Sequence, residues 1–239
     1  LIRATVYTKF QHMLRNQFDE EIIRAAEELD KEFLHALLKL IEWEGPIQPS
    51  QTMQVQMAIQ DGGCGLRSLV DLASGAYLAS WALVADFVEQ VLPQRMDWDL
   101  GRLGEGQKGR PTTPLDIAVQ QAYAHYEQVT GQAPPPMHSL IHLDKAQRVL
   151  GKRIDEAKAS KFVAAAKIEG TGDMVRDEWA IESETRANAA GGSLSSQHWT
   201  TAPAEYGETI EDAASILDAQ RRLGYQQLVP VGARCAHVR

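Results

Sequence analysis

One stretch decides the fold: residues 61–81 read DGGCGLRSLVDLASGAYLASW. Its first five residues place three glycines around Cys64, which predicts a turn with backbone angles that other residues rarely adopt. Ser68 stands where it can cap a following helix, with Asp71 three residues later as in a capping box. Small side chains fill the first turns of that helix, so we expect a second helix to approach it closely.

The same helix extends beyond residue 81, and Pro93 is expected to end it. Apolar side chains recur along it at three- and four-residue spacing, which indicates one buried face. We expect this helix to be structural, with large apolar side chains that are mostly buried, namely Leu72, Trp81, Leu83 and Phe87.

Outward from this stretch, apolar periodicity and capping residues predict further helices over residues 2–18, 19–43, 113–130, 139–168, 173–189 and 210–223. Residues 53–59 alternate between apolar and mostly polar side chains, which is typical of an extended segment. We therefore predict a mainly α fold, an irregular multi-helix assembly with a Gly-rich turn and long loops. The predicted division is a helical region over 1–100, a Gly-rich linker over 101–112 and a second helical region over 113–239.

Composition limits the class of protein. The chain has 239 residues and a net charge of −8, which argues against a protein that wraps nucleic acid over its whole surface. No apolar run is long enough for a membrane span, so we expect no membrane partner. Two cysteines, Cys64 and Cys235, are too few for a disulfide scaffold, and they favour an intracellular setting, cytoplasmic or nuclear.

Three motifs resemble functional sites, but structural explanations are favoured for each. Residues 104–109 match G-x-G-x-x-G but lack the strand and helix of a dinucleotide site, so a linker is favoured. His138 and His142 are four residues apart, with no further metal ligand between them. Cys64 has no histidine nearby that would activate it, and we expect a half-buried turn residue.

Cys235 and His237 supply two zinc ligands, whereas a structural zinc needs four. They are therefore candidates only as the start of a truncated site. No adjacent pair of aspartates occurs in the chain, so the sequence offers no polymerase-type Mg²⁺ site and no catalytic residues. We expect no cofactor in this chain, and no polymerase or nuclease activity from it alone.

A basic stretch over residues 145–167 stands out in this acidic chain, with seven basic and two acidic side chains. On a helix, Lys145, Arg148, Lys152 and Arg153 lie on one side, and apolar residues lie on the opposite side. This pattern is compatible with an ordinary solvated face or with a row of contacts to a phosphate backbone. On the second interpretation, binding is independent of base sequence and falls steeply with salt.

The quoted stretch resembles the G-G-x-G-L-R-S…A-A-Y-x-A-S-W segment that follows the polymerase core in reverse transcriptases of non-LTR retrotransposon-like elements. Upstream, RNQFD at residues 15–19 and Ile22 match that family's helical R-x-x-F-D…I stretch. Downstream, four blocks follow the family's order: GG at 191–192, WTTAP at 199–203, IED at 210–212 and RRLGY at 221–225. The similarity covers residues 2–237, and Cys64 replaces the usual apolar residue of the turn.

This resemblance implies a thumb-like region over 1–100 and a connecting region after the linker, leading towards a truncated Cys/His segment. The catalytic palm domain, which would use Mg²⁺, is expected upstream of Leu1. The implied function is a non-catalytic helical fragment that supports template and primer binding, with RNA or an RNA–DNA duplex and the palm domain as partners. The alternatives are a helical protein-interaction scaffold with no nucleic-acid role, or a small cytosolic enzyme whose site the sequence does not reveal.

Overall fold

Residues 6–91 and 113–168 are the part of the chain that the computed structural model describes. Helices make up most of this part and no strand occurs in it, which confirms the predicted mainly α class. The short 3-10 segment η2 spans Ile59–Asp61. The α-helices are α1 (Thr8–Asn16), α2 (Glu20–Leu40), α3 (Pro49–Val55), α4 (Leu69–Val91), α5 (Pro114–Thr130), α6 (Met137–Ile141) and α7 (Ala146–Ile168).

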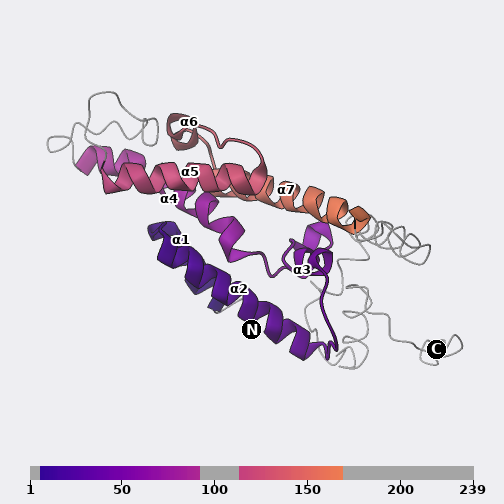
Figure 1. The fold of residues 1–239 in the computed structure, drawn as a ribbon. Coiled ribbons are helices and arrows are strands. Elements are labelled where there is room, and N and C mark those ends of the chain that lie inside the picture. Colours follow the sequence, from indigo (N-terminus) through magenta and orange to yellow (C-terminus); the bar gives the residue numbers. More distant parts are fainter. Residues whose placement is uncertain (1–5, 92–112, 169–239) are drawn as a thin grey trace, which may run out of the picture.

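Helix α4 is the centre of the arrangement, because it packs against α1, α2, α5, α6 and α7. In its N-terminal half, every residue from Leu72 to Ala79 is buried. A helix that is apolar all round requires neighbours on every face. Figure 1 shows those neighbours: α1 and α2 lie on one side of α4, and α5 and α7 lie on the other.

Small side chains bring α7 close to α4, as the sequence predicted. A Cβ atom placed on Gly75 would lie 3.0 Å from Cδ1 of Ile154 and 3.6 Å from Cβ of Leu150. Both of these α7 side chains are buried. The close approach of two backbones is what glycine allows at such a crossing.

One hydrophobic core contains buried side chains from both described parts of the chain. Leu14 of α1 and Phe18 belong to the same cluster as Tyr126 of α5 and Leu150 of α7. The Phe18 ring lies 5.7 Å from the Tyr77 ring and 5.6 Å from the His125 ring, measured between centroids. The predicted linker at 101–112 lies outside the described residues, so the division there stays a prediction.

The Gly-rich turn adopts the unusual backbone angles that the sequence predicted. Gly62 and Gly65 have φ values of 84° and 77°. Gly63 is buried, and its amide donates to the Ala58 carbonyl at 3.0 Å. The Cys64 side chain is half-buried beside a small cluster around Ile41 and Val55, as expected of a structural turn residue.

The prediction of an extended segment at 53–59 is wrong, because α3 occupies Pro49–Val55. Proline suits the first turn of a helix, and the Gln51 side chain accepts from the backbone N–H of Gln48 at 2.8 Å. The buried face of α3 is largely polar and includes Gln51 and Gln54. Apolar alternation therefore did not report which face of this segment is buried.

Two further expectations are corrected. The predicted helix over 139–168 is split into α6 and α7, and Lys145 interrupts it with a φ of 59°. In the C-terminal half of α4, Leu83 and Phe87 are exposed, whereas Ala82 and Ala85 are buried. Close packing places small residues on the contact side of the helix and leaves the large ones outside.

Candidate nucleic-acid interface

A groove of about 1100 Å³ is lined by residues of α1, α4, α6 and α7 and of the segment that joins α6 to α7. Its walls carry five basic side chains and two carboxylates, with His12 beside them. The carboxylates belong to Asp144 and Asp155. The basic residues are Arg15, Arg67, Lys145, Arg148 and Lys152. Cations from distant parts of the chain thus converge on one concave surface.

Three of the four residues predicted from the basic stretch line this groove. Arg148 and Lys152 are exposed and lie four residues apart on α7, so they occupy the same face of the helix. The Lys152 ammonium lies 3.5 Å from a Glu156 oxygen. Both side chains are mostly exposed, and ion pairs of this kind contribute little to stability. Both cations therefore remain accessible to an anion in the groove.

Lys145 lines the groove just before α7 begins, and its backbone conformation is unusual. It has a φ of 59°, which a residue with a Cβ rarely adopts. Its carbonyl accepts from the amides of Arg148 and Val149 at 2.8 and 3.2 Å, at the start of α7. Its ammonium lies 3.9 Å from the Asp144 carboxylate, and both side chains are exposed. The residue that interrupts the predicted helix thus places a third cation at the groove.

Arg15 comes from α1 and was not among the predicted site residues. Its guanidinium donates to Oε1 of Gln147 at 2.7 Å, which links α1 to α7 at the groove. His12, one turn earlier, is also exposed and lines the groove. The resemblance singled out Arg15 as part of a helical motif, but only the packing of α1 places it beside Arg148.

Arg67 has a structural role in the groove wall. Its Nε and a terminal nitrogen donate to the two Asp155 carboxylate oxygens at 2.9 and 2.7 Å. The terminal nitrogen also donates to the Gly151 carbonyl at 3.2 Å. Burial raises the pKa of Asp155, although Arg67 opposes this effect. Since this guanidinium is compensated by its own carboxylate, four basic residues remain for a ligand.

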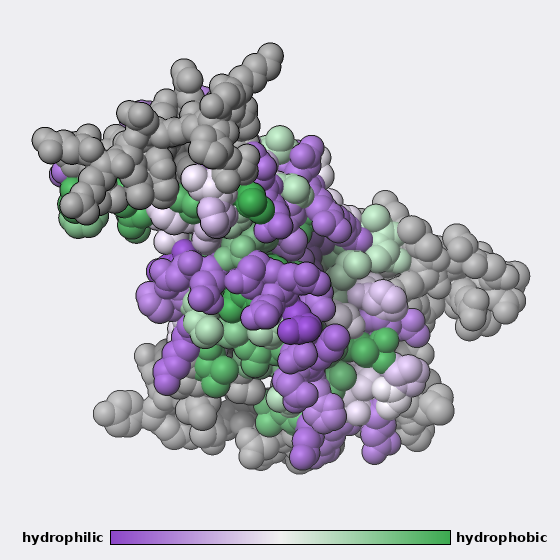
Figure 2. Space-filling model, turned by 60° about the vertical axis from the view of Figure 1, so that its left-hand side comes forward, coloured by the Kyte–Doolittle hydropathy of each residue, from purple (hydrophilic) through white to green (hydrophobic). Residues whose placement is uncertain are grey.

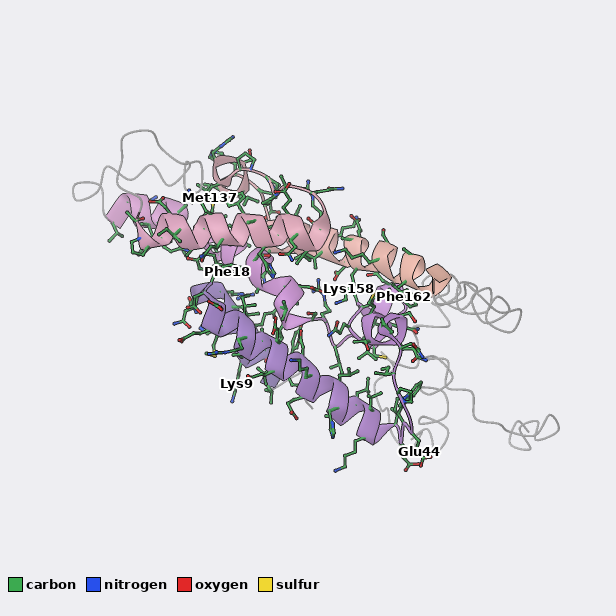
Figure 3. All side chains as sticks on the ribbon, in the orientation of Figure 1. Lys9, Phe18, Glu44, Met137, Lys158 and Phe162 are labelled. Atoms are coloured by element: carbon green, nitrogen blue, oxygen red, sulfur yellow. The ribbon has the colours of Figure 1, made fainter. Side chains whose placement is uncertain are left out.

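Arg153, the fourth predicted residue, does not line the groove. It lies against the Tyr126 hydroxyl, whose pKa is raised by burial and lowered to a smaller extent by Arg153. Two later lysines of the stretch also have other partners. Lys158 donates to Asp71 and Gln56, and Lys161 donates to the Val129 carbonyl. Figure 3 places Lys158 and Phe162 where α7 meets α3.

The remaining candidate residues do not form a site in the described part of the chain. His138 lies in α6, and His142 directly follows that helix. Among the described residues, no group of three or more His, Cys, Asp or Glu side chains is placed so that it could hold a metal ion. Cys235, His237 and residues 104–109 lie outside them.

None of the described helices combines the length and the apolar character needed to cross a membrane. Comparisons with protein-family models, with curated proteins and with solved structures found no match.

Proposed function

We propose that the chain is a non-catalytic nucleic-acid-binding module of a mobile-element reverse transcriptase, and that its groove supports the template–primer duplex. The observation that carries the proposal is the convergence of Arg15, Lys145, Arg148 and Lys152 on one groove. The sequence resemblance to the region after a polymerase core supports the assignment to that class of enzyme. RNA or an RNA–DNA duplex is the ligand, and a polymerase palm domain is the expected partner.

Lysine and arginine in such a groove recognise phosphates, which position a nucleic acid without reading its bases. The chain carries a net charge of −8, so attraction to a polyanion must be confined to the basic surface. Four neutralised phosphates would release enough counterions to weaken binding about 100-fold between about 50 and about 200 mM salt. We therefore expect binding that ignores base sequence and depends steeply on salt.

The experiment measures the binding of a fluorescently labelled RNA–DNA hybrid by anisotropy at these two salt concentrations. The test variant combines Arg148→Glu and Lys152→Glu. A matched control combines Arg24→Glu and Lys31→Glu, which makes the same charge change at exposed positions of α2 outside the groove. We expect the test variant to lose at least about tenfold in affinity at low salt and to show a shallower salt dependence, by about two charges.

The control variant should bind within about threefold of the parent, because Arg24 and Lys31 do not line the groove and salt weakens interactions between exposed charges that are not in contact. Equal losses in both variants would mean that only net charge matters, and would contradict a defined interface. Absence of binding by the parent at low salt would favour the alternative of a protein-interaction scaffold. That alternative rests on the exposed apolar residues Leu83, Phe87 and Val91 of α4.

A further inference from the structure

The groove continues into an apolar surface on α4. Leu83 lines the groove and is 83% exposed. Phe87 and Val91 follow at intervals of four residues, are 65% and 57% exposed, and lie on the same face of the helix. The C-terminal end of α4 lies at the left of Figure 1. Figure 2 brings that side forward and shows hydrophobic residues at the surface among hydrophilic ones.

An exposed phenylalanine beside a cationic groove has a chemical counterpart in single-stranded nucleic acid. The phosphates of a single strand follow a basic groove, while its unpaired bases stack on aromatic side chains. Bases have an apolar face whatever their identity, so this contact is as insensitive to sequence as the phosphate contacts. Phe87 lies one helical turn beyond the groove wall at Leu83, which is about 6 Å along the helix axis.

Resting on the function proposed above, we propose that the groove binds a duplex end that carries an unpaired overhang, with a base of the overhang stacked on Phe87. The four basic residues hold the phosphates, and the Leu83–Phe87 face holds the bases. A purely apolar protein surface would leave the cations of the adjoining groove without a counterpart, whereas the phosphates of a nucleic acid supply one. A second copy docked symmetrically on this face would bring two basic grooves together, and like charges would oppose it.

The experiment compares three probes by fluorescence anisotropy: a blunt RNA–DNA hybrid, the same hybrid with a short single-stranded overhang, and the hybrid with an abasic overhang. The abasic overhang adds the same phosphates but no bases. We expect the base-containing overhang to bind about five- to a hundredfold more tightly than the abasic one, the range that one stacked base gives. Phe87→Ala should abolish this preference and leave binding of the blunt hybrid unchanged, whereas Phe87→Trp should retain it.

Leu40→Ala serves as the control, because it removes an equally exposed apolar side chain from α2. It should leave all three affinities unchanged. If the blunt hybrid binds through the groove but the two overhangs bind equally, the stacking site is wrong and the proposed function stands. If no probe binds, both proposals are wrong. A parent chain that sediments as a dimer and becomes monomeric on Phe87→Ala would assign the α4 face to self-association and overturn the inference.

Discussion

At the scale of single residues, the backbone of the Gly-rich turn lies so close to the backbone of Met57 that Gly63 cannot be replaced without strain. A Cβ atom on Gly63 would lie 2.3 Å from the Met57 carbonyl oxygen and 2.5 Å from the Met57 carbonyl carbon. Those atoms belong to the backbone, so they cannot rotate away as a side chain would. The sequence predicted the turn, but the particular glycine that permits no side chain is known only from the packing.

Gly63→Ala is therefore expected to lower the free energy of unfolding by about 1–3 kcal/mol, as overpacking does. Gly151→Ala is the matched control, because its nearest neighbour is the end of the Arg67 side chain at 3.4 Å. In the middle of α7, alanine should be neutral or stabilise the protein by up to about 1 kcal/mol. Urea unfolding of the three proteins checks this, and equal stability of Gly63→Ala and the parent would contradict it.

His125 is predicted to make stability depend on pH. Burial lowers the pKa of His125 below its ordinary value of about 6.5, and Asp71 opposes this effect weakly. The ring sits between Ser74, whose Oγ lies 3.1 Å from Nδ1, and the edge-on ring of Phe18. The unfolded chain therefore binds a proton at this residue more readily than the folded chain does. Stability from this residue is complete above about pH 6.5 and is lost as the pH falls towards the lowered value.

The check is urea unfolding on both sides of about pH 6.5 for the parent and for His125→Gln. We expect the parent to lose more stability on acidification than the variant. Buried carboxyls such as Asp30 and Asp155, whose pKa values are raised, act in the opposite direction but are common to both proteins. An identical pH dependence of stability in the two proteins would contradict a lowered pKa of His125 in the folded chain.

At the scale of elements, α4 changes its character along its length. Its N-terminal half is surrounded by other helices, whereas its C-terminal half turns small side chains inward and leaves Leu83 and Phe87 outside. Apolar periodicity identified the helix and its cap at Ser68, which donates to Asp30 at 2.7 Å and accepts from Asp71 N–H at 3.2 Å. It did not identify the buried face, because it scored large side chains as the core.

Phe87→Ala should accordingly lower the free energy of unfolding by less than about 1 kcal/mol, since the residue is largely in water already. Leu78→Ala, in the buried half of the same helix, should lower it by about 2–5 kcal/mol. The two variants are compared by chemical denaturation. A large loss of stability in Phe87→Ala would mean that other residues cover this face of α4. Because the expected loss is small, Phe87→Ala should remain folded in the binding experiment described above.

At the scale of the whole molecule, polar contacts tie α7 to elements from the first part of the chain. Arg67 pairs with Asp155, and Lys158 pairs with Asp71 in a largely buried position. Asp30 accepts hydrogen bonds from the start of α4, including the Leu69 amide at 2.9 Å. The Arg67 and Lys158 pairs fix α7 beside α4, and the Asp30 contacts hold α2 against the start of α4. The groove of the proposed function depends on the placement of α7 beside α4.

The sequence by itself determined the local features: the mainly α class, the Gly-rich turn, and the caps at Ser68 and Thr113. Each of these features depends on residues within a few positions of one another, so it can be predicted from their spacing along the chain. The tertiary structure alone decided which α4 face is buried, that α3 is a helix, and that Arg15 joins Arg148 while Arg153 turns towards Tyr126. These depend on the distance and direction of packed helices, which chain spacing does not encode.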